Sequence, residues 1–291
     1  MKTIFVEQLT TAQMQGYLQS AVAPRPIALA STISQAGDVN LSPFSFFNVF
    51  SANPPVLIFS PVRRVRDGAT KHTLDNLKEV PQVSIQIVNY AIVEQMSLAS
   101  SEFPKGENEF TKAGFTEIPC DRIRPPRVKE APVSFECEVM EIISLGEQAG
   151  AGQLVLAKVI ALHIQEEYLH ENGTLDTTKL DLVARMGENW YTRITKDTLF
   201  EIPKPLQNLG IGVDSLPLHV RESTVLTGNQ LGRLGNTKHL PTEREIEEFI
   251  RKNTNYFSGE MPMEAIHTLA AEWINEGRLE EAKLLLWAIK V

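Results

Sequence analysis

The sequence predicts a mainly β protein with helices: a β-barrel decorated by helices, followed by a C-terminal helical extension. The first observation is a set of alternating apolar runs, clearest at residues 82–88, 134–144 and 153–166. The second is the turn chemistry between such runs, at residues 34–38 and in the glycine-rich segment 146–152. The third is the return of helical periodicity near the C-terminus.

The remaining elements of the first two thirds of the chain follow from the same signals. Residues 10–21 predict an opening helix that ends before Pro24 and Pro26. Further strands are expected at residues 27–33 and 56–59, and further helices at residues 73–79, 90–99 and 108–113.

Composition changes near Phe200, which predicts a barrel domain at residues 1–202 and an extension at residues 203–291. Residues 203–240 are rich in proline and glycine and are expected to form an irregular arm. Its leucines, Leu226, Leu231 and Leu234, are expected to anchor the arm against the barrel.

Three helices are expected after the arm. Thr242 is a plausible cap for a helix at residues 243–253. Residues 262–275 and 279–289 resemble one tetratricopeptide-like helical hairpin, which cannot bury its own apolar face. The hairpin is therefore expected to pack on the barrel or the partner subunit, with another protein as the alternative.

Residues 40–61 combine hydroxyls, amides and phenylalanines at a density that a core strand does not carry. Alternation of Phe44 and Phe46 with polar neighbours predicts a strand with one wet face. Asn53-Pro54-Pro55 ends that strand, and the apolar residues that follow read as a buried strand. A wet, aromatic-edged strand beside a buried one suits a flat ligand with a polar rim.

The next segment carries a basic cluster, with Arg63, Arg64, Arg66 and Lys71 against Asp67. The chain as a whole is acidic, with 36 Asp+Glu against 28 Lys+Arg, so a local anionic partner is favoured over nucleic acid. A helix capped by Thr70 or His72 would add backbone donors to a phosphate site. The alternative is a solvated arginine-rich loop.

Seven segments in a fixed order carry a family resemblance. They are V-A-P-R-P-I-A-L-A-S-T (22–32), N-L-S-P-F-S-F-F (40–47), N-P-P-V-L-I-F-S (53–60), T-K-H-T-L-D-N (70–76), G-E-N-E-F-T-K-A-G-F (106–115), P-P-R-V-K-E-A-P-V-S-F-E-C (125–137) and A-R-M-G-E-N-W-Y (184–191). Together they resemble the flavin reductase-like, FMN-binding split-barrel family, most closely its flavoredoxin type, over residues 18–199. The family usually has Lys-Asp-Thr where this chain has Lys71-His72-Thr73, which makes the site more basic.

The resemblance implies an FMN-binding split β-barrel and a set of cofactor-binding residues. Lys71 and Thr73 would hold the phosphate, with His72 between them. The ribityl and phosphate side would be lined by Ser31, Thr32 and Asn40, and the pyrimidine edge by backbone amides of Ser45, Phe46 and Phe47; Ser42 and Asn48 belong to the same set. Core packing is the alternative for the phenylalanines, and we expect Phe44 or Phe47 to be the buried one.

Arg185 is the candidate catalytic residue, because an arginine near the flavin neutralises charge that develops on reduction. A surface ion pair is the alternative role. The chain has no Rossmann glycine fingerprint, so NADH or NADPH would bind transiently over the flavin. The family also implies a homodimer with FMN at the subunit interface.

The leading hypothesis is an FMN-dependent oxidoreductase that passes electrons from NADH or NADPH to free flavin, ferric iron or another acceptor. The alternatives are an FMN-binding electron carrier of the flavoredoxin kind without nicotinamide activity, and a flavin-binding scaffold that uses the C-terminal helices. No metal is expected, since the six histidines lack metal-site spacing. Two cysteines outside a C-x-x-C pair, and no apolar run near about 20 residues, predict a cytoplasmic protein without a membrane segment.

Overall fold

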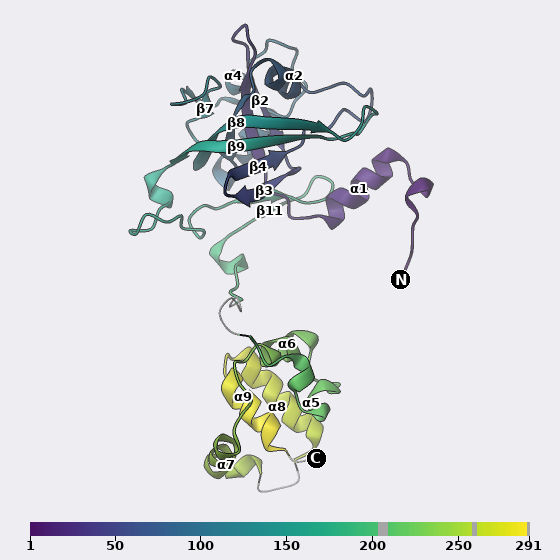
Figure 1. Ribbon diagram of the computed structural model, residues 1–291, viewed down its shortest axis with the longest axis vertical. Coiled ribbons are helices and arrows are strands. Elements are labelled where there is room, and N and C mark those ends of the chain that lie inside the picture. The colour runs from purple at the N-terminus through teal and green to yellow at the C-terminus, as the bar shows by residue number, and fades with distance from the viewer. Residues whose placement is uncertain (203–208, 258–260, 290–291) are drawn as a thin grey trace. The chain divides into compact units, whose positions relative to one another are not determined.

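The structure is a computed structural model that describes residues 1–202, 209–257 and 261–289. It divides the chain into two compact units, Met1–Phe200 and Glu201–Val291. The colours of Figure 1 follow the chain from one unit into the other. In the part of the chain that is described, no helix combines the length and the apolar character needed to cross a membrane.

The first unit is built on a seven-stranded sheet in which every pairing is antiparallel. The strand order is β2-β1-β5-β8-β9-β4-β3, with β1 at Ala28–Ile33, β2 at Val39–Phe44, β3 at Phe47–Ala52, β4 at Pro55–Phe59, β5 at Gln82–Ile87, β8 at Val133–Ser144 and β9 at Gln153–Ile164. Two small sheets pair β6 (Glu117–Ile118) with β7 (Arg127–Val128) and β10 (Val183–Arg185) with β11 (Tyr191–Arg193). The long β8–β9 hairpin has two register shifts, and such irregularities bend a strand pair and increase its twist.

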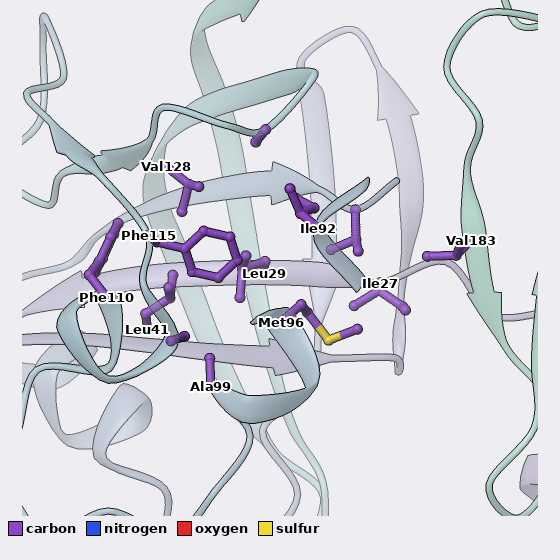
Figure 2. Packing of buried hydrophobic residues seen from close by; sticks show 13 residues of the cluster. Ile27, Leu29, Leu41, Ile92, Met96, Ala99, Phe110, Phe115, Val128 and Val183 are labelled. Atoms are coloured by element: carbon purple, nitrogen blue, oxygen red, sulfur yellow. The ribbon is translucent and has the colours of Figure 1, made fainter. Parts of the chain in front are cut away.

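Apolar side chains cover both faces of this sheet. Val83 and Ile85, predicted to point inward from β5, are fully buried in one cluster with Phe44 and Phe59. The other face is covered by helices α3 (Val93–Leu98) and α4 (Glu109–Ala113). Figure 2 shows Leu29 and Leu41 of the sheet packed with Met96 and Phe110 from these helices. The prediction of a barrel decorated by helices is therefore confirmed.

The other helices of the first unit are α1 (Thr11–Ala21), α2 (His72–Glu79) and the 3-10 turns η1 (Val6–Gln8), η2 (Tyr90–Ile92), η3 (Glu166–Tyr168) and η4 (Lys196–Thr198). Among them, α1, α2 and η2 agree with the sequence prediction within a few residues, whereas η1, η3 and η4 were not predicted. Helix α1 begins with a capping box, in which Thr10 and Gln13 exchange hydrogen bonds.

The second unit is helical. It contains η5 (Val213–Ser215), α5 (Leu218–Arg221), α6 (Gly228–Gly235), α7 (Glu243–Lys252), η6 (Thr254–Tyr256), α8 (Met263–Asn275) and α9 (Leu279–Ala288). The predicted cap of α7 is confirmed, because the Thr242 hydroxyl accepts from the Glu245 backbone N–H at 3.3 Å. The predicted hairpin is also present as α8 and α9, separated by Gly277.

The expectation of an irregular arm at residues 203–240 is wrong for its described part, residues 209–240, which contains α5 and α6. Leu226 and Leu234 are buried in the core of the helical unit with Trp273, so they do not anchor an arm to the barrel. The prediction failed because the glycines of this segment allow close packing of the backbone and do not mark a loop. The Gly212 N–H, for example, donates to Gly235 O at 2.9 Å. Residues 203–208 lie outside the described part. The packing of this unit on the barrel or on a partner subunit stays a prediction.

Candidate functional site

A pocket of about 360 Å³ lies in the first unit, between α1, the β2–β3 connection and the basic loop that follows β4. It is lined by Gln15 and Gln19 of α1, by Pro43, Phe44, Ser45 and Phe46, by Ser60, Val62, Arg63, Arg64, Val65 and Arg66, and by Lys71 and Glu102. Three of the predicted cofactor-binding residues, Ser45, Phe46 and Lys71, therefore share one pocket.

The pocket carries an excess of positive charge. Three arginines and Lys71 line it, and Glu102 is the one acid among the lining residues. Glu102 lies 3.4 Å from Arg64 and 3.2 Å from Arg66, which leaves Lys71 and Arg63 without an ion pair in the described chain. The buried Nε of Arg63 also lacks a hydrogen-bond partner there. Unpaired buried cations are costly unless a ligand supplies the counter-charge, so this pocket fits an anion.

Helix α2 begins at the pocket, because its N-cap residue, Lys71, lines it. No described side chain caps the helix. The dipole of the helix favours an anion near its N-terminus, beside these cations. Burial and the neighbouring Arg64 lower the pKa of Lys71. The prediction that Thr70 or His72 caps this helix is wrong: the Thr70 hydroxyl instead bonds the Asp75 carboxylate at 3.1 Å.

Two of the predicted residues on β1 and β2, Thr32 and Asn40, belong to a buried polar network outside the pocket lining. Asn40 Nδ2 donates to Thr73 Oγ1 at 3.0 Å, and Asn76 Nδ2 donates to Thr32 Oγ1 at 3.3 Å. These four side chains are buried and none of them lines the pocket. Their bonds join the first turns of α2 to the sheet, and thereby fix the position of Lys71. Ser31 is also buried, and its hydroxyl has no described partner.

The other predicted residues lie outside the pocket lining. Ser42 and His72 are half-buried, and Phe47 packs partly against the barrel core. Asn48 is exposed and its side-chain oxygen accepts from the Val49 N–H at 2.8 Å. Of Phe44 and Phe47, Phe44 is the buried one, with its ring 5.3 Å from that of Phe59, although it also contributes to the pocket lining.

Arg185, the candidate catalytic residue, ends β10. Its guanidinium lies 4.6 Å from the centre of the Tyr191 ring and donates to Glu188 O at 2.8 Å. Among the described residues it forms no ion pair within 4 Å, so the alternative of a surface ion pair finds no support there. Its positive charge remains available to a ligand.

Sequence reasoning missed two parts of the site. The first is the α1 wall, Gln15 and Gln19, which the four-residue spacing places on one helix face. The second is Arg25, which is 6% exposed and lies 3.5 Å from the Ser45 hydroxyl. The sequence could have indicated this residue, because Arg25 lies between Pro24 and Pro26 in an apolar segment, and a buried arginine requires hydrogen-bond partners.

A separate cluster brings Asp121, Glu136 and His163 within 4.8 Å of one another. The Glu136 carboxylate already accepts from the backbone N–H groups of Asp121 and Arg122, both at 2.8 Å, and contacts His163 Nε2 at 2.6 Å. Burial opposes its ionisation, but these hydrogen bonds hold the pKa of Glu136 below its ordinary value. We therefore interpret the cluster as a structural one, in which the Glu136 carboxylate holds the loop that contains Asp121.

A helix-covered barrel with a cationic pocket beside a helix N-terminus has the charge that an anionic ligand requires. Residues 20–179 match the family described as "Flavin reductase like domain". A relative from Halalkalibacterium halodurans, an uncharacterized protein, is 33% identical over 204 residues, which are 69% of this chain and 97% of the relative. The chain therefore belongs to the flavin reductase-like family of split-barrel oxidoreductases, as the sequence resemblance predicted.

Two solved structures are similar to this chain over about 70% of its length. Nitrilotriacetate monooxygenase component B from Bacillus cereus is 28% identical, with a TM-score of 0.65, and covers 69% of this chain and 98% of its own. The 2-nitrobenzoate 2-nitroreductase of Pseudomonas fluorescens is also 28% identical, with a TM-score of 0.63, and covers 72% of this chain and 100% of its own. The matched family domain ends before the helical unit begins.

Proposed function

We propose that the protein binds FMN in the cationic pocket and transfers electrons through it from NADH or NADPH to an acceptor such as free flavin or ferric iron. The observation that carries this proposal is Lys71, unpaired among the described residues, half-buried and at the open N-terminus of α2. Bound FMN supplies the hydride- and electron-transfer chemistry that amino-acid side chains lack.

The residues of the pocket divide the work of binding. Lys71, Arg63 and the first turn of α2 offer the donors and charges that a phosphate requires. Ser45 and Phe46 form the wall of the same pocket and would hold the edge of the ring system. Arg185 would stabilise negative charge on the reduced cofactor, and its contact with the Tyr191 ring helps to hold the guanidinium in place.

An anaerobic titration tests the oxidoreductase proposal. The purified protein, loaded with FMN, is expected to lose its yellow absorbance when NADH or NADPH is added without oxygen, and to regain it when an acceptor is added. Dithionite serves as the control for complete reduction. Bleaching by dithionite but by neither nicotinamide would leave an electron carrier, and failure to retain FMN would overturn the proposal.

The proposal includes a homodimer with FMN at the subunit interface and a cytoplasmic location. Exposed Val49 and Phe50 on β3 support the dimer, because a second subunit would cover them. Cys120 and Cys137 are free, which is typical of a reducing compartment. Burial raises the pKa of the Cys120 thiol to about 11, so this thiol stays protonated and unreactive.

Truncation after Glu201 is expected to leave FMN bound, because every residue that lines the pocket lies between Gln15 and Glu102. The FMN dissociation constant should change by less than about threefold. We propose that the helical unit packs on the barrel or on the partner subunit, so the truncated protein should accept bulkier oxidants faster or lose its dimer. Flavin-binding, acceptor and light-scattering assays against the full chain check this. No change in acceptor range or assembly would make the unit a separate partner-binding module.

A further inference from the structure

Helix α1 forms one side of the pocket although it is weakly packed. None of its eleven residues is buried, and Tyr17 and Leu18 are 52% and 46% exposed. Gln15 and Gln19 are its contribution to the pocket. A helix of this length is marginal without tertiary contacts, so the position of this wall depends on whatever holds the ends of α1.

Arg25 holds the C-terminal end of α1. Its Nη1 donates to the carbonyl oxygens of Gln19 and Val22, the latter at 3.0 Å. Its Nη2 donates to Met186 O at 2.8 Å, in the connection between β10 and β11. One guanidinium therefore joins the helix to the barrel, and Gln19, whose carbonyl it holds, is itself a pocket residue.

The surroundings of Arg25 fit this task. Its backbone N–H and carbonyl pair with those of Arg185, both at 2.9 Å, which fixes its main chain to β10. Burial, followed by the nearby Arg185, lowers the pKa of Arg25. No described carboxylate lies within 4 Å of it, so carbonyl oxygens are its main partners. A cation at the C-terminus of a helix meets unpaired carbonyls and the negative end of the dipole.

The same loop accepts α1 at close range. A Cβ atom at Gly187 would lie 3.2 Å from the Ser20 Cα, so the missing side chain lets the helix backbone approach. Near the other end of the helix, a Cβ atom at Gly150 would lie 2.8 Å from the Thr11 methyl group. Helix α1 is thus fitted to the barrel at both ends, with the guanidinium of Arg25 as its polar anchor.

We propose that Arg25 is a positioning residue that holds α1 against the pocket, and that the held helix makes the site select a mononucleotide flavin over a dinucleotide flavin. This inference rests on the proposed function. A phosphate bound by Lys71 and Arg63 would lie in the pocket that Gln15 and Gln19 line. FMN ends at that phosphate. FAD continues with a second phosphate and an adenosine, for which the walls of the pocket, α1 among them, would have to leave room.

The first measurement is hydrogen exchange in the FMN-free full-length protein, on the backbone amides of residues 14–22. Arg25→Ala and Arg25→Lys are expected to speed exchange there by about tenfold or more, since an ammonium cannot bridge two segments as the guanidinium does. Arg193→Ala is the matched control. It removes the same charge from an exposed residue that stacks on Tyr90 at 3.7 Å and pairs with Asp181 at 2.7 Å.

The second measurement is the ratio of FAD to FMN dissociation constants, from titrations of the same proteins. The wild type and Arg193→Ala are expected to favour FMN by at least about tenfold, and Arg25→Ala to lose most of that preference. The double variant Gln15→Ala, Gln19→Ala opens the wall without touching Arg25 and is expected to lower the ratio as well. It keeps the test decisive if Arg25→Ala does not fold.

Each contrary outcome has its own meaning. Unchanged exchange in both Arg25 variants would show that Arg25 does not hold α1. Faster exchange with an unchanged ratio, or a wild type that binds both flavins equally, would remove α1 as the selective wall while leaving FMN binding intact. A wild type that binds neither flavin overturns the proposed function itself, and with it the selectivity.

Discussion

Replacing Lys71 with alanine is expected to weaken FMN binding by roughly ten- to a hundredfold. The ammonium is half-buried at the N-cap of α2 and has no ion pair within the described chain. A phosphate in the pocket would give Lys71 the negatively charged partner that it lacks among the described residues. Such charge-assisted hydrogen bonds contribute about 1.5–3 kcal/mol. The alanine variant loses this contact and gains no compensating one.

Fluorescence titration of FMN into the apoprotein measures this effect. Lys78→Ala is the control, because Lys78 belongs to the same helix but is exposed in its last turn. The control removes one positive charge from α2 and should leave the dissociation constant within about twofold. Equal affinity in wild type and Lys71→Ala would show that the basic cluster serves another ligand.

The arginines near Lys71 divide into two groups. The reading of this segment as a solvated loop is wrong for Arg64, whose side chain is only 24% exposed, and for Arg63, whose Nε is buried and unpaired. It is right for Arg66, which is 70% exposed and pairs with Asp67 at 3.1 Å. Sequence spacing identified the cluster, but the burial of each arginine depends on long-range packing.

The strands of the barrel were predictable because the alternation of apolar and polar residues within each strand indicates which side chains are buried. Val83 and Ile85 alternate with polar residues in the sequence and are buried in the structure. The signal is incomplete even here, because Ser84 and Gln86, which alternate with these residues, are also 0% exposed. The capping-box pair Thr242 and Glu245 is by itself enough to predict the start of α7.

The site was only partly predictable, because its polar residues pair across long sequence distances. The sequence predicts Asn40 and Thr73 as ligand contacts, and in the structure they bond each other and join a strand to a helix. Arg25 and Met186 form a hydrogen bond although 161 positions separate them in the sequence. A hydroxyl or an amide in a strand indicates that a partner exists, but its type does not reveal whether that partner is a ligand or another part of the chain.

The largest effect on assembly is expected from Phe50→Asp. Strand β3 is the last in the sheet order as described, and Val49 and Phe50 on it are both 64% exposed. An exposed apolar edge strand is prone to association unless another surface covers it, and in the proposed homodimer a second subunit covers it. A carboxylate placed in that interface would lose its hydration without gaining a cation, which weakens association strongly.

Sedimentation equilibrium is expected to show the wild type as a dimer and Phe50→Asp with a dimer dissociation constant raised by about a hundredfold or more. FMN affinity should fall with it, because the cofactor in the proposed dimer is covered by the second subunit. Leu98→Asp is the control: Leu98 is 48% exposed on α3, which contacts β2, the strand at the other end of the sheet order. A wild type that is monomeric yet retains FMN would defeat the dimer proposal, whereas a dimer that survives Phe50→Asp would move the interface to another face.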